Sequence, residues 1–220
     1  MESKLGLHDL LARLVPGGAF LWALSWILTS AGLEGIPKLT GGIAETAAFV
    51  LVAYVAGVAL DSVGRWTVEA ALYKIIGRPS SRFLVDHPGV GESEREHYRN
   101  VAQTLVPKRS QITFDGDGAA DNSHFVCRRA IALYGSRTEK MLSMSAQYGM
   151  HRTLVACCFV LQWLSVVLAV VQRLSWWPAI GLLGLGALFF FGTNHWGFNV
   201  CRTAMDLADE EFRKRVESFD

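Results

Sequence analysis

Apolar residues gather along the chain in four long runs that are almost free of charge. A helix of about 20 residues, rising about 1.5 Å per residue, crosses a hydrocarbon core about 30 Å thick. Membrane β-strands would be shorter and would alternate apolar with polar residues, which these runs do not do. The pattern therefore predicts four membrane-spanning helices, at Gly17–Leu33, Ile43–Leu60, Thr153–Val171 and Trp177–Val200.

The helical pattern continues beyond one end of three of these runs. It predicts one helix from about residue 43 to 76, since Gly77 and Pro79 are the first helix breakers there. It predicts another from Asn122 to Val171, a stretch without proline. The fourth run continues into an amphipathic C-terminal helix. We therefore predict an all-α integral membrane protein with four transmembrane helices, three of them extended into a cytoplasmic helical bundle.

Two short motifs predict where helices begin. Pro16-Gly17-Gly18 should start the first spanning helix, because proline is tolerated in the first turn of a helix and disfavoured within it. Ser93 followed by Glu96 is a capping-box pattern, which predicts a short helix from about residue 93 to 106.

The distribution of basic residues predicts the orientation. All lysines and arginines except Lys38 and Arg173 lie before the first run, between the second and third, or after the fourth. Cytoplasmic loops carry such an excess, so both termini and the middle segment should be cytoplasmic. The expected regions are 1–60 with transmembrane helices 1 and 2, the cytoplasmic helical region 61–152, transmembrane helices 3 and 4 in 153–200, and the cytoplasmic C-terminal helix 201–220.

Composition agrees with a membrane protein and argues against several other classes. The chain is 51% hydrophobic and 19% charged, whereas soluble domains are typically about 25% charged. Its cysteines lie inside a run or on the predicted reducing side, so no disulfide framework is expected. We see no clustered metal ligands, phosphate loop or nucleophile elbow. We therefore expect no metal, no cofactor, no catalytic residue and no enzyme activity.

Polar side chains within or next to the apolar runs are candidates for lining or gating a pore. Such groups are costly in a bilayer and tend to face the bundle interior or water. Thr193–Asn199 lie near the inner end of the fourth span, at about the same predicted depth as Asp61, Arg65, His151 and Arg152. These residues could form one polar layer at the inner mouth. The pore and gate candidates are Glu45, Asp61, Arg65, Gln162, His195 and Asn199.

Each candidate also has a structural explanation. Glu45 could be a first-turn acid that the helix dipole favours. Gln162 could be an interhelical hydrogen-bond partner, and Asp61 and Arg65 could be a structural ion pair. His195 and Asn199 could contact lipid headgroups instead of a central axis.

Small residues on the second run suggest close helix packing. Ala53, Gly57 and Gly64 share one helical face, and small residues let helices approach closely in lipid. They are candidates for a homo-oligomer interface, and packing within one subunit is the alternative. Since four short spans leave little room for a wide hole, we expect an aqueous path on a symmetry axis, most simply in a homotetramer.

Basic residues of the middle segment could hold a phosphate-bearing ligand. The alternative is a solvated helix face near anionic lipid. The ligand-binding candidates are Arg128, Arg129, Arg137 and Lys140.

Three stretches resemble a group of small four-span bacterial membrane proteins found in phage-defence operons. They are LVPGGAFL at 14–21, AYVAGVALDSVGR at 53–65 and FVCRRAIALYGSRTEKMLSMSAQYGMHRTL at 125–154. The layout is similar to the channel effector of Hailong-type systems, and the size and span count are also similar to the membrane subunit of Kiwa-type systems.

The resemblance implies a homo-oligomeric channel in the bacterial inner membrane that depolarises the infected cell. It further implies control by a nucleotide, made by a partner nucleotidyltransferase, that binds the cytoplasmic region. The alternative function is a non-conducting membrane sensor or scaffold that recruits a partner through the cytoplasmic bundle.

Overall fold

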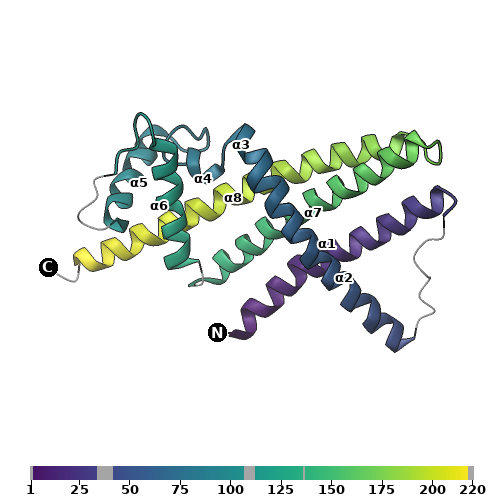
Figure 1. Cartoon of the computed structure of the whole chain (residues 1–220). Coiled ribbons are helices and arrows are strands. Elements are labelled where there is room, and N and C mark those ends of the chain that lie inside the picture. Colours follow the sequence, from purple (N-terminus) through teal and green to yellow (C-terminus); the bar gives the residue numbers. More distant parts are fainter. Residues whose placement is uncertain (1, 34–41, 107–111, 136, 218–220) are drawn as a thin grey trace. The chain divides into compact units, whose positions relative to one another are not determined.

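The computed structural model describes residues 2–33, 42–106, 112–135 and 137–217. The chain is 83% helical, with no strand in the described part, which confirms the predicted all-α class (Figure 1). The elements are α1 Glu2–Ser30, α2 Ile43–Gly64, the π-helix η1 Arg65–Leu72, α3 Tyr73–Ile76, α4 Pro79–Arg82, α5 Glu92–Leu105, α6 Ala119–Tyr134, α7 Glu139–Val170 and α8 Trp177–Glu217.

Four segments are long and apolar enough to cross a membrane, as the sequence predicted. They are Leu10–Ser30, Ile43–Ala70, Glu139–Val170 and Trp177–Lys214. Large apolar side chains on them are exposed in the single chain, among them Trp22, Leu51, Trp163 and Leu188. Such surfaces need lipid or protein cover, so the chain is a multi-pass membrane protein.

The helices form two compact units. The membrane unit comprises Met1–Leu72 and Ala146–Thr193, and the bundle unit comprises Tyr73–Ser145 and Asn194–Asp220. Helices α7 and α8 contribute residues to both.

In the membrane unit, α7 and α8 are neighbouring antiparallel helices and α1 crosses α2 (Figure 1). Leu161 and Leu168 of α7 pack with Ile27 of α1 and with Leu182 of α8.

The bundle unit has an apolar core of its own. Buried side chains from α5, α6, the start of α7 and the end of α8 meet in it, including Val101, Val126, Met141 and Met205. The Tyr98 hydroxyl donates a hydrogen bond to Asp206 at 2.5 Å, which ties α5 to α8. Burial and the neighbouring Asp206 carboxylate raise the pKa of Tyr98, so this hydroxyl stays a donor.

The predicted start of the first spanning helix is wrong. Helix α1 begins at Glu2 and contains Pro16 in its interior. An interior proline removes one backbone hydrogen bond, yet Pro16 is fully buried and its carbonyl accepts a hydrogen bond from the Cys157 thiol at 3.6 Å. Packing against α2 and α7 therefore offsets the cost that the sequence motif suggested.

The predicted single helix from Asn122 to Val171 is also wrong, because it is broken after Tyr134. Thr138 caps α7, since its side-chain oxygen accepts the backbone N–H of Met141 at 3.2 Å. Tyr134 and Met141, on either side of the break, are both buried in the bundle core. The chain turn lets α6 and α7 bury different faces in that core.

The capping box was not found at the start of α5. This helix begins at Glu92 with Gly91 as its N-cap, and no side chain caps it. The acids Glu92 and Glu94 in the first turn interact favourably with the helix dipole. They supply the N-terminal stabilisation that Ser93 and Glu96 were expected to provide.

Candidate functional site: a buried charged cluster

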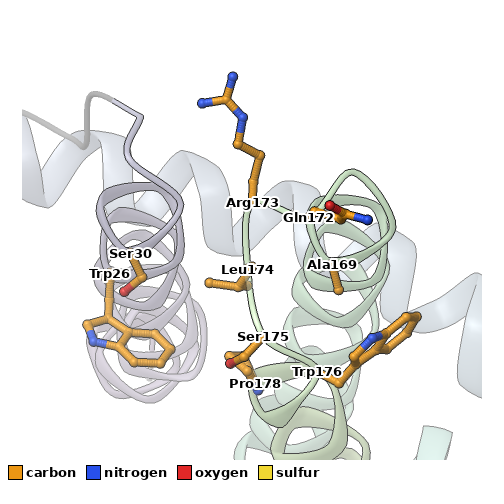
Figure 2. A pocket seen from close by; sticks show the side chains of 9 residues that line it. All are labelled: Trp26, Ser30, Ala169, Gln172, Arg173, Leu174, Ser175, Trp176 and Pro178. Atoms are coloured by element: carbon orange, nitrogen blue, oxygen red, sulfur yellow. The ribbon is translucent and has the colours of Figure 1, made fainter.

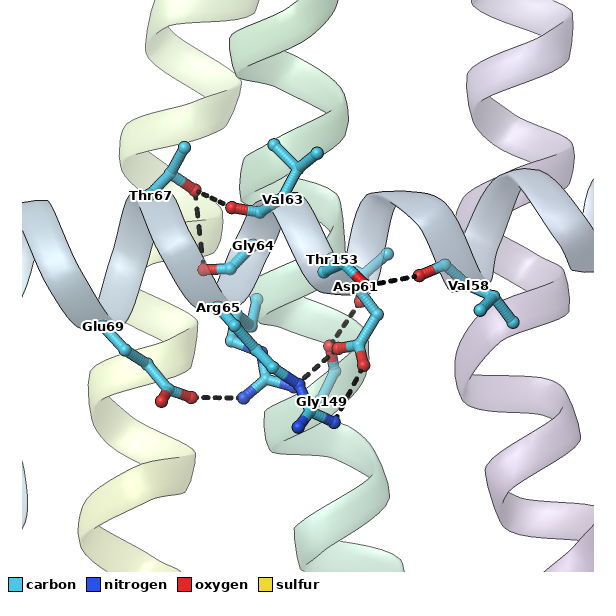
Figure 3. Close-up of polar contacts among 11 residues, drawn as sticks. Val58, Asp61, Val63, Gly64, Arg65, Thr67, Glu69, Gly149 and Thr153 are labelled. Atoms are coloured by element: carbon cyan, nitrogen blue, oxygen red, sulfur yellow. Dashed lines mark hydrogen bonds and ion pairs between the residues drawn. The ribbon is translucent and has the colours of Figure 1, made fainter.

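Four charged side chains meet in the membrane unit, and we call them the charged cluster: Asp61, Arg65, Glu69 and Arg152. Arg152 of α7 donates one hydrogen bond to Asp61 at 2.5 Å and another to Glu69. Arg65 bonds the second carboxylate oxygen of Asp61 at 3.2 Å. Figure 3 labels Asp61, Arg65 and Glu69 along the α2–η1 helix, and Arg152 of α7 contacts both carboxylates. Two acids and two bases make the cluster neutral.

Burial increases from one side of the cluster to the other. The side chains of Arg152 and Asp61 are 9% and 13% exposed, whereas Glu69 is 39% and Arg65 62% exposed. Arg152 also lies over the ring of Tyr148, with 5.5 Å from its guanidinium carbon to the ring centroid. Arg152 and Asp61 are therefore the buried pair, and a buried charge is tolerated only with such partners.

Small residues allow the two helices to approach at the cluster. A Cβ atom on Gly64 would lie 2.9 Å from the carbonyl oxygen of Arg152. Thr153, next in α7, is buried and bonds its hydroxyl to the Gly149 carbonyl at 2.9 Å. Gly64 is thus required for the close contact that places Arg152 beside Asp61.

The helix that carries both acids changes its winding at the cluster. The predicted helix from 43 to 76 is continuous, but Arg65–Leu72 is a π-helix. An α-helix turns about 100° per residue, which would set Glu69 about 80° away from Asp61 around the axis. A π-helix forms hydrogen bonds between residues i and i+5 and therefore turns less per residue than an α-helix. This moves Glu69 back towards the helix face that carries Asp61. Thr67 of η1 donates a hydrogen bond from its hydroxyl to the Val63 carbonyl of α2 at 2.9 Å.

Comparison with known proteins adds nothing to this geometry. No known protein family, curated protein or solved structure matches the chain. The function is therefore inferred from the charged cluster and the apolar helices around it. Segments of π-helix are rare and often mark functional sites, which makes this cluster the leading candidate.

The structure brings together only part of the predicted polar layer. Asp61 contacts both Arg65 and Arg152. His151 lies outside the cluster, since its ring bonds the Gln147 carbonyl at 2.9 Å and packs on Gly192. Glu69 was missed, because its i+8 spacing from Asp61 would not place the two acids on one face of an α-helix.

The other pore candidates are not members of the charged cluster. Glu45 is exposed in the first turn of α2, and Gln162 is half-buried on α7. His195 and Asn199 belong to the bundle unit, where the Asn199 amide and the His195 ring are hydrogen-bonded at 2.9 Å. The sequence left open where these two point, and in this chain they pair with each other.

The small-residue face of α2 is occupied within the chain. Ala53 is buried, and a Cβ on Gly57 would overlap the Arg13 carbonyl of α1. Gly64 packs on Arg152 of α7 in the same way. Within the single chain, Ala53, Gly57 and Gly64 therefore serve helix packing, which is the alternative that the sequence left open for them.

Of the four ligand-binding candidates, one is engaged by an acid. Arg137 forms an ion pair with Glu211 and stacks over Tyr134 at 4.9 Å. Arg128, Arg129 and Lys140 are exposed on α6 and α7. These three form the remaining candidate surface for a phosphate-bearing ligand.

One serine–histidine contact in the bundle unit is not arranged for nucleophilic catalysis. The Ser80 hydroxyl lies 2.7 Å from Nδ1 of His124, and Arg78 lies 3.1 Å from Nε2. Because an arginine only donates, Nε2 must accept and Nδ1 carries the proton. That proton points at Ser80, so His124 cannot act as its base. Among the described residues, no three His, Cys, Asp or Glu side chains gather as metal ligands.

The stability of the bundle unit should fall as the pH drops below about 6.5, the usual pKa of histidine. His87 stacks on Phe198 with 4.1 Å between ring centroids, and its Nδ1 accepts the Gly89 N–H at 3.1 Å. Burial lowers the pKa of His87, Arg82 and Arg95 lower it further, and Asp86 opposes them. The unfolded chain then binds the proton more readily, so stability rises with pH up to the unfolded pKa and is lost as the pH falls towards the folded one.

Hydrogen exchange of α5 and α6 between about pH 5 and 8, corrected for intrinsic rates, measures this effect. His87→Gln should flatten the pH dependence, because it removes the titrating ring. An unchanged slope in that variant would assign the pH dependence to another group.

Proposed function

We propose that this protein is a homo-oligomeric membrane channel that is controlled through its bundle unit. The observation that carries the proposal is the charged cluster on a π-helix between apolar spanning segments. Ionisable groups at such positions cost free energy, and proteins commonly retain them for ion pathways or switching.

The cluster suits a gate because its contacts can exchange. Arg152 holds the well-buried Asp61 and the more exposed Glu69, and Glu69 depends on the π winding of η1 to reach it. The chain passes directly from η1 to α3 at Tyr73, where the bundle unit begins. A ligand on the bundle unit that favoured α-helical winding of η1 would withdraw Glu69 from Arg152. The π winding and the α winding of η1 would be two discrete states, and the ligand would shift the equilibrium between them.

Uncovered surface on α2 supports assembly into an oligomer. Its first turns, Ile43–Ala48, are exposed in the single chain and include the charged Glu45. An exposed surface that carries a charge on a spanning helix is poorly suited to lipid, and neighbouring copies around an axis would cover it. We propose a homotetramer with Glu45 near the outer mouth.

The biological setting of the proposal comes from the resemblance in layout to phage-defence effectors. In that setting the protein lies in the bacterial inner membrane with both termini in the cytoplasm. Opening would depolarise the infected cell. The nucleotide product of a partner nucleotidyltransferase would bind exposed cations of the bundle unit, with Arg128, Arg129 and Lys140 as candidates.

A non-conducting sensor or scaffold is the second candidate. It is favoured by the pairing of both buried charges, Asp61 and Arg152, within one chain. A structural ion pair needs no pore, and the bundle unit would then serve to recruit a partner.

Glu69→Gln should raise ligand-independent conductance several-fold without changing the single-channel current. The substitution removes one charge from the closed-state contact with Arg152, whose partly exposed position limits its contribution to about 1 kcal/mol. Glu45→Gln should instead change the single-channel current, because that residue is proposed to lie near the outer mouth. The measurement is bilayer recording of the purified oligomer, with mass determined in detergent.

The exposed Glu96, which is in the bundle unit, provides a matched control. Glu96→Gln should leave both conductance and assembly unchanged. A monomer in detergent, together with no current from wild type or from Glu69→Gln, would favour the sensor over the channel.

A further inference from the structure

A pocket of about 660 Å³ lies in the membrane unit beside the turn between α7 and α8. Figure 2 shows Trp26 of α1 and Trp176 of the turn on opposite sides, with Arg173 extending beyond the turn. The lining residues are Trp26, Ser30, Ala169, Gln172, Arg173, Leu174, Ser175, Trp176 and Pro178.

The two helices beside the pocket end in the same backbone motif. In α1, the Leu33 N–H bonds the Leu28 carbonyl and the Gly32 N–H bonds the Thr29 carbonyl. In α7, the N–H groups of Arg173 and Gln172 bond the carbonyls of Leu168 and Ala169 in the same way. This Schellman pattern needs a left-handed residue at one position, where glycine is usual.

The α7 motif contains a residue that is unfavourable at this position. Gly32 takes the left-handed conformation just after α1 with φ of 72°, whereas Gln172 takes it just after α7 with φ of 57°. Gln172 is the sole non-glycine residue with positive φ in the described part of the chain. A side chain there costs of order 1 kcal/mol, and such strain is typical of positions selected for a task other than stability. The Gln172 side chain lines the pocket. A role for its amide in the pocket would explain why glutamine is kept at this strained position.

The lining matches a phosphate ester that carries an apolar tail. Arg173 is an exposed cation that forms no ion pair with the described residues. Ser30, Gln172 and Ser175 add hydrogen-bonding groups below it. Tryptophan at such a level is typical of the membrane–water interface, where its ring lies beside the glycerol region of lipids. Exposed apolar side chains continue along α8 with Trp177 and Ile180.

We propose that this pocket binds one phospholipid, with its phosphate at Arg173 and its acyl chains along Trp26 and Leu174. Ser30, Gln172 and Ser175 also line the pocket and could hydrogen-bond the glycerol esters of the lipid. The bound lipid fills the space between the end of α1 and the α7–α8 turn. This site is independent of the proposed channel activity.

The test uses the full-length protein in detergent, delipidated and then titrated with phosphatidylglycerol or phosphatidylethanolamine under native mass spectrometry. Arg173→Gln should weaken retention of the first bound lipid about tenfold, and Trp26→Ala should weaken it several-fold. Two substitutions are matched controls: Trp22→Ala, on an exposed tryptophan of α1 that does not line the pocket, and Lys74→Gln, on an exposed lysine of the bundle unit. Both should retain the lipid as wild type does.

Gln172→Gly separates binding from folding, because its two effects should have opposite signs. It should raise the melting temperature of the lipid-free protein, since glycine relieves the left-handed strain. It should also lower lipid retention, since the amide is lost. Equal retention in wild type, Arg173→Gln and Gln172→Gly would overturn the proposal. An equal rise in melting temperature with inorganic phosphate and with phosphatidylglycerol would also overturn the proposal, because the site would then recognise a soluble anion.

Discussion

Arg152→Ala is expected to lower the free energy of unfolding of the membrane unit by about 3–5 kcal/mol, the cost of breaking a buried ion pair by removing one partner. The guanidinium is the shared partner of Asp61 and Glu69, and its side chain is 9% exposed. Without it, the exposed Arg65 is the one charged partner that Asp61 keeps among the described residues. Unfolding in mixed micelles, monitored by circular dichroism, measures the loss.

Arg65→Ala is the matched control, because this arginine contacts the same carboxylate from the exposed side of the cluster. It should cost about 1 kcal/mol or less, as exposed ion pairs do. In the double variant Arg152→Ala/Asp61→Asn the loss should be clearly smaller than the sum of the two single losses, since the second substitution removes the orphaned charge. Equal losses for Arg152→Ala and Arg65→Ala would show that the burial difference has no energetic effect.

The sequence was sufficient to predict the apolar helices and part of the cluster, because both depend on residue type and coarse spacing. Charges next to apolar runs are rare, which singled out Asp61, Arg65 and Arg152. Glu69 was missed because its place beside Arg152 depends on the π winding of η1. Winding of that kind follows from packing between helices and has no simple sequence signature.

The wrong helix boundaries have a common physical origin, since tertiary packing overrode a local preference in each. Pro16 is kept inside α1 by burial against other helices. The break between α6 and α7 follows from Thr138 as a cap and from a core that buries both Tyr134 and Met141. Local sequence showed neither of these core contacts. The small face of α2 was correctly identified as a packing surface, but its partner was a helix of the same chain.

Gly17→Ala and Gly57→Ala are each expected to destabilise the membrane unit by about 3 kcal/mol, at the upper end of the cost of overpacking. A Cβ on Gly17 would overlap the Ala53 carbonyl of α2, and one on Gly57 would overlap the Arg13 carbonyl of α1. In both cases the obstacle is backbone, which cannot change rotamer to make room. The helices must therefore separate, which also exposes the buried Ala53.

Gly18 supplies a control one residue away in the same helix, since a Cβ there meets nothing within 4 Å. Gly18→Ala should stabilise the protein by up to about 1 kcal/mol, because alanine has the higher helix propensity. Adjacent glycines in one helix should thus give changes of opposite sign in the same unfolding assay. The double variant Gly17→Ala/Gly57→Ala should lose less than the sum of its parts, because a single separation of α1 and α2 relieves both overlaps. Additive losses would instead place the two glycines at independent contacts, and equal effects of Gly17→Ala and Gly18→Ala would exclude the close crossing of α1 and α2.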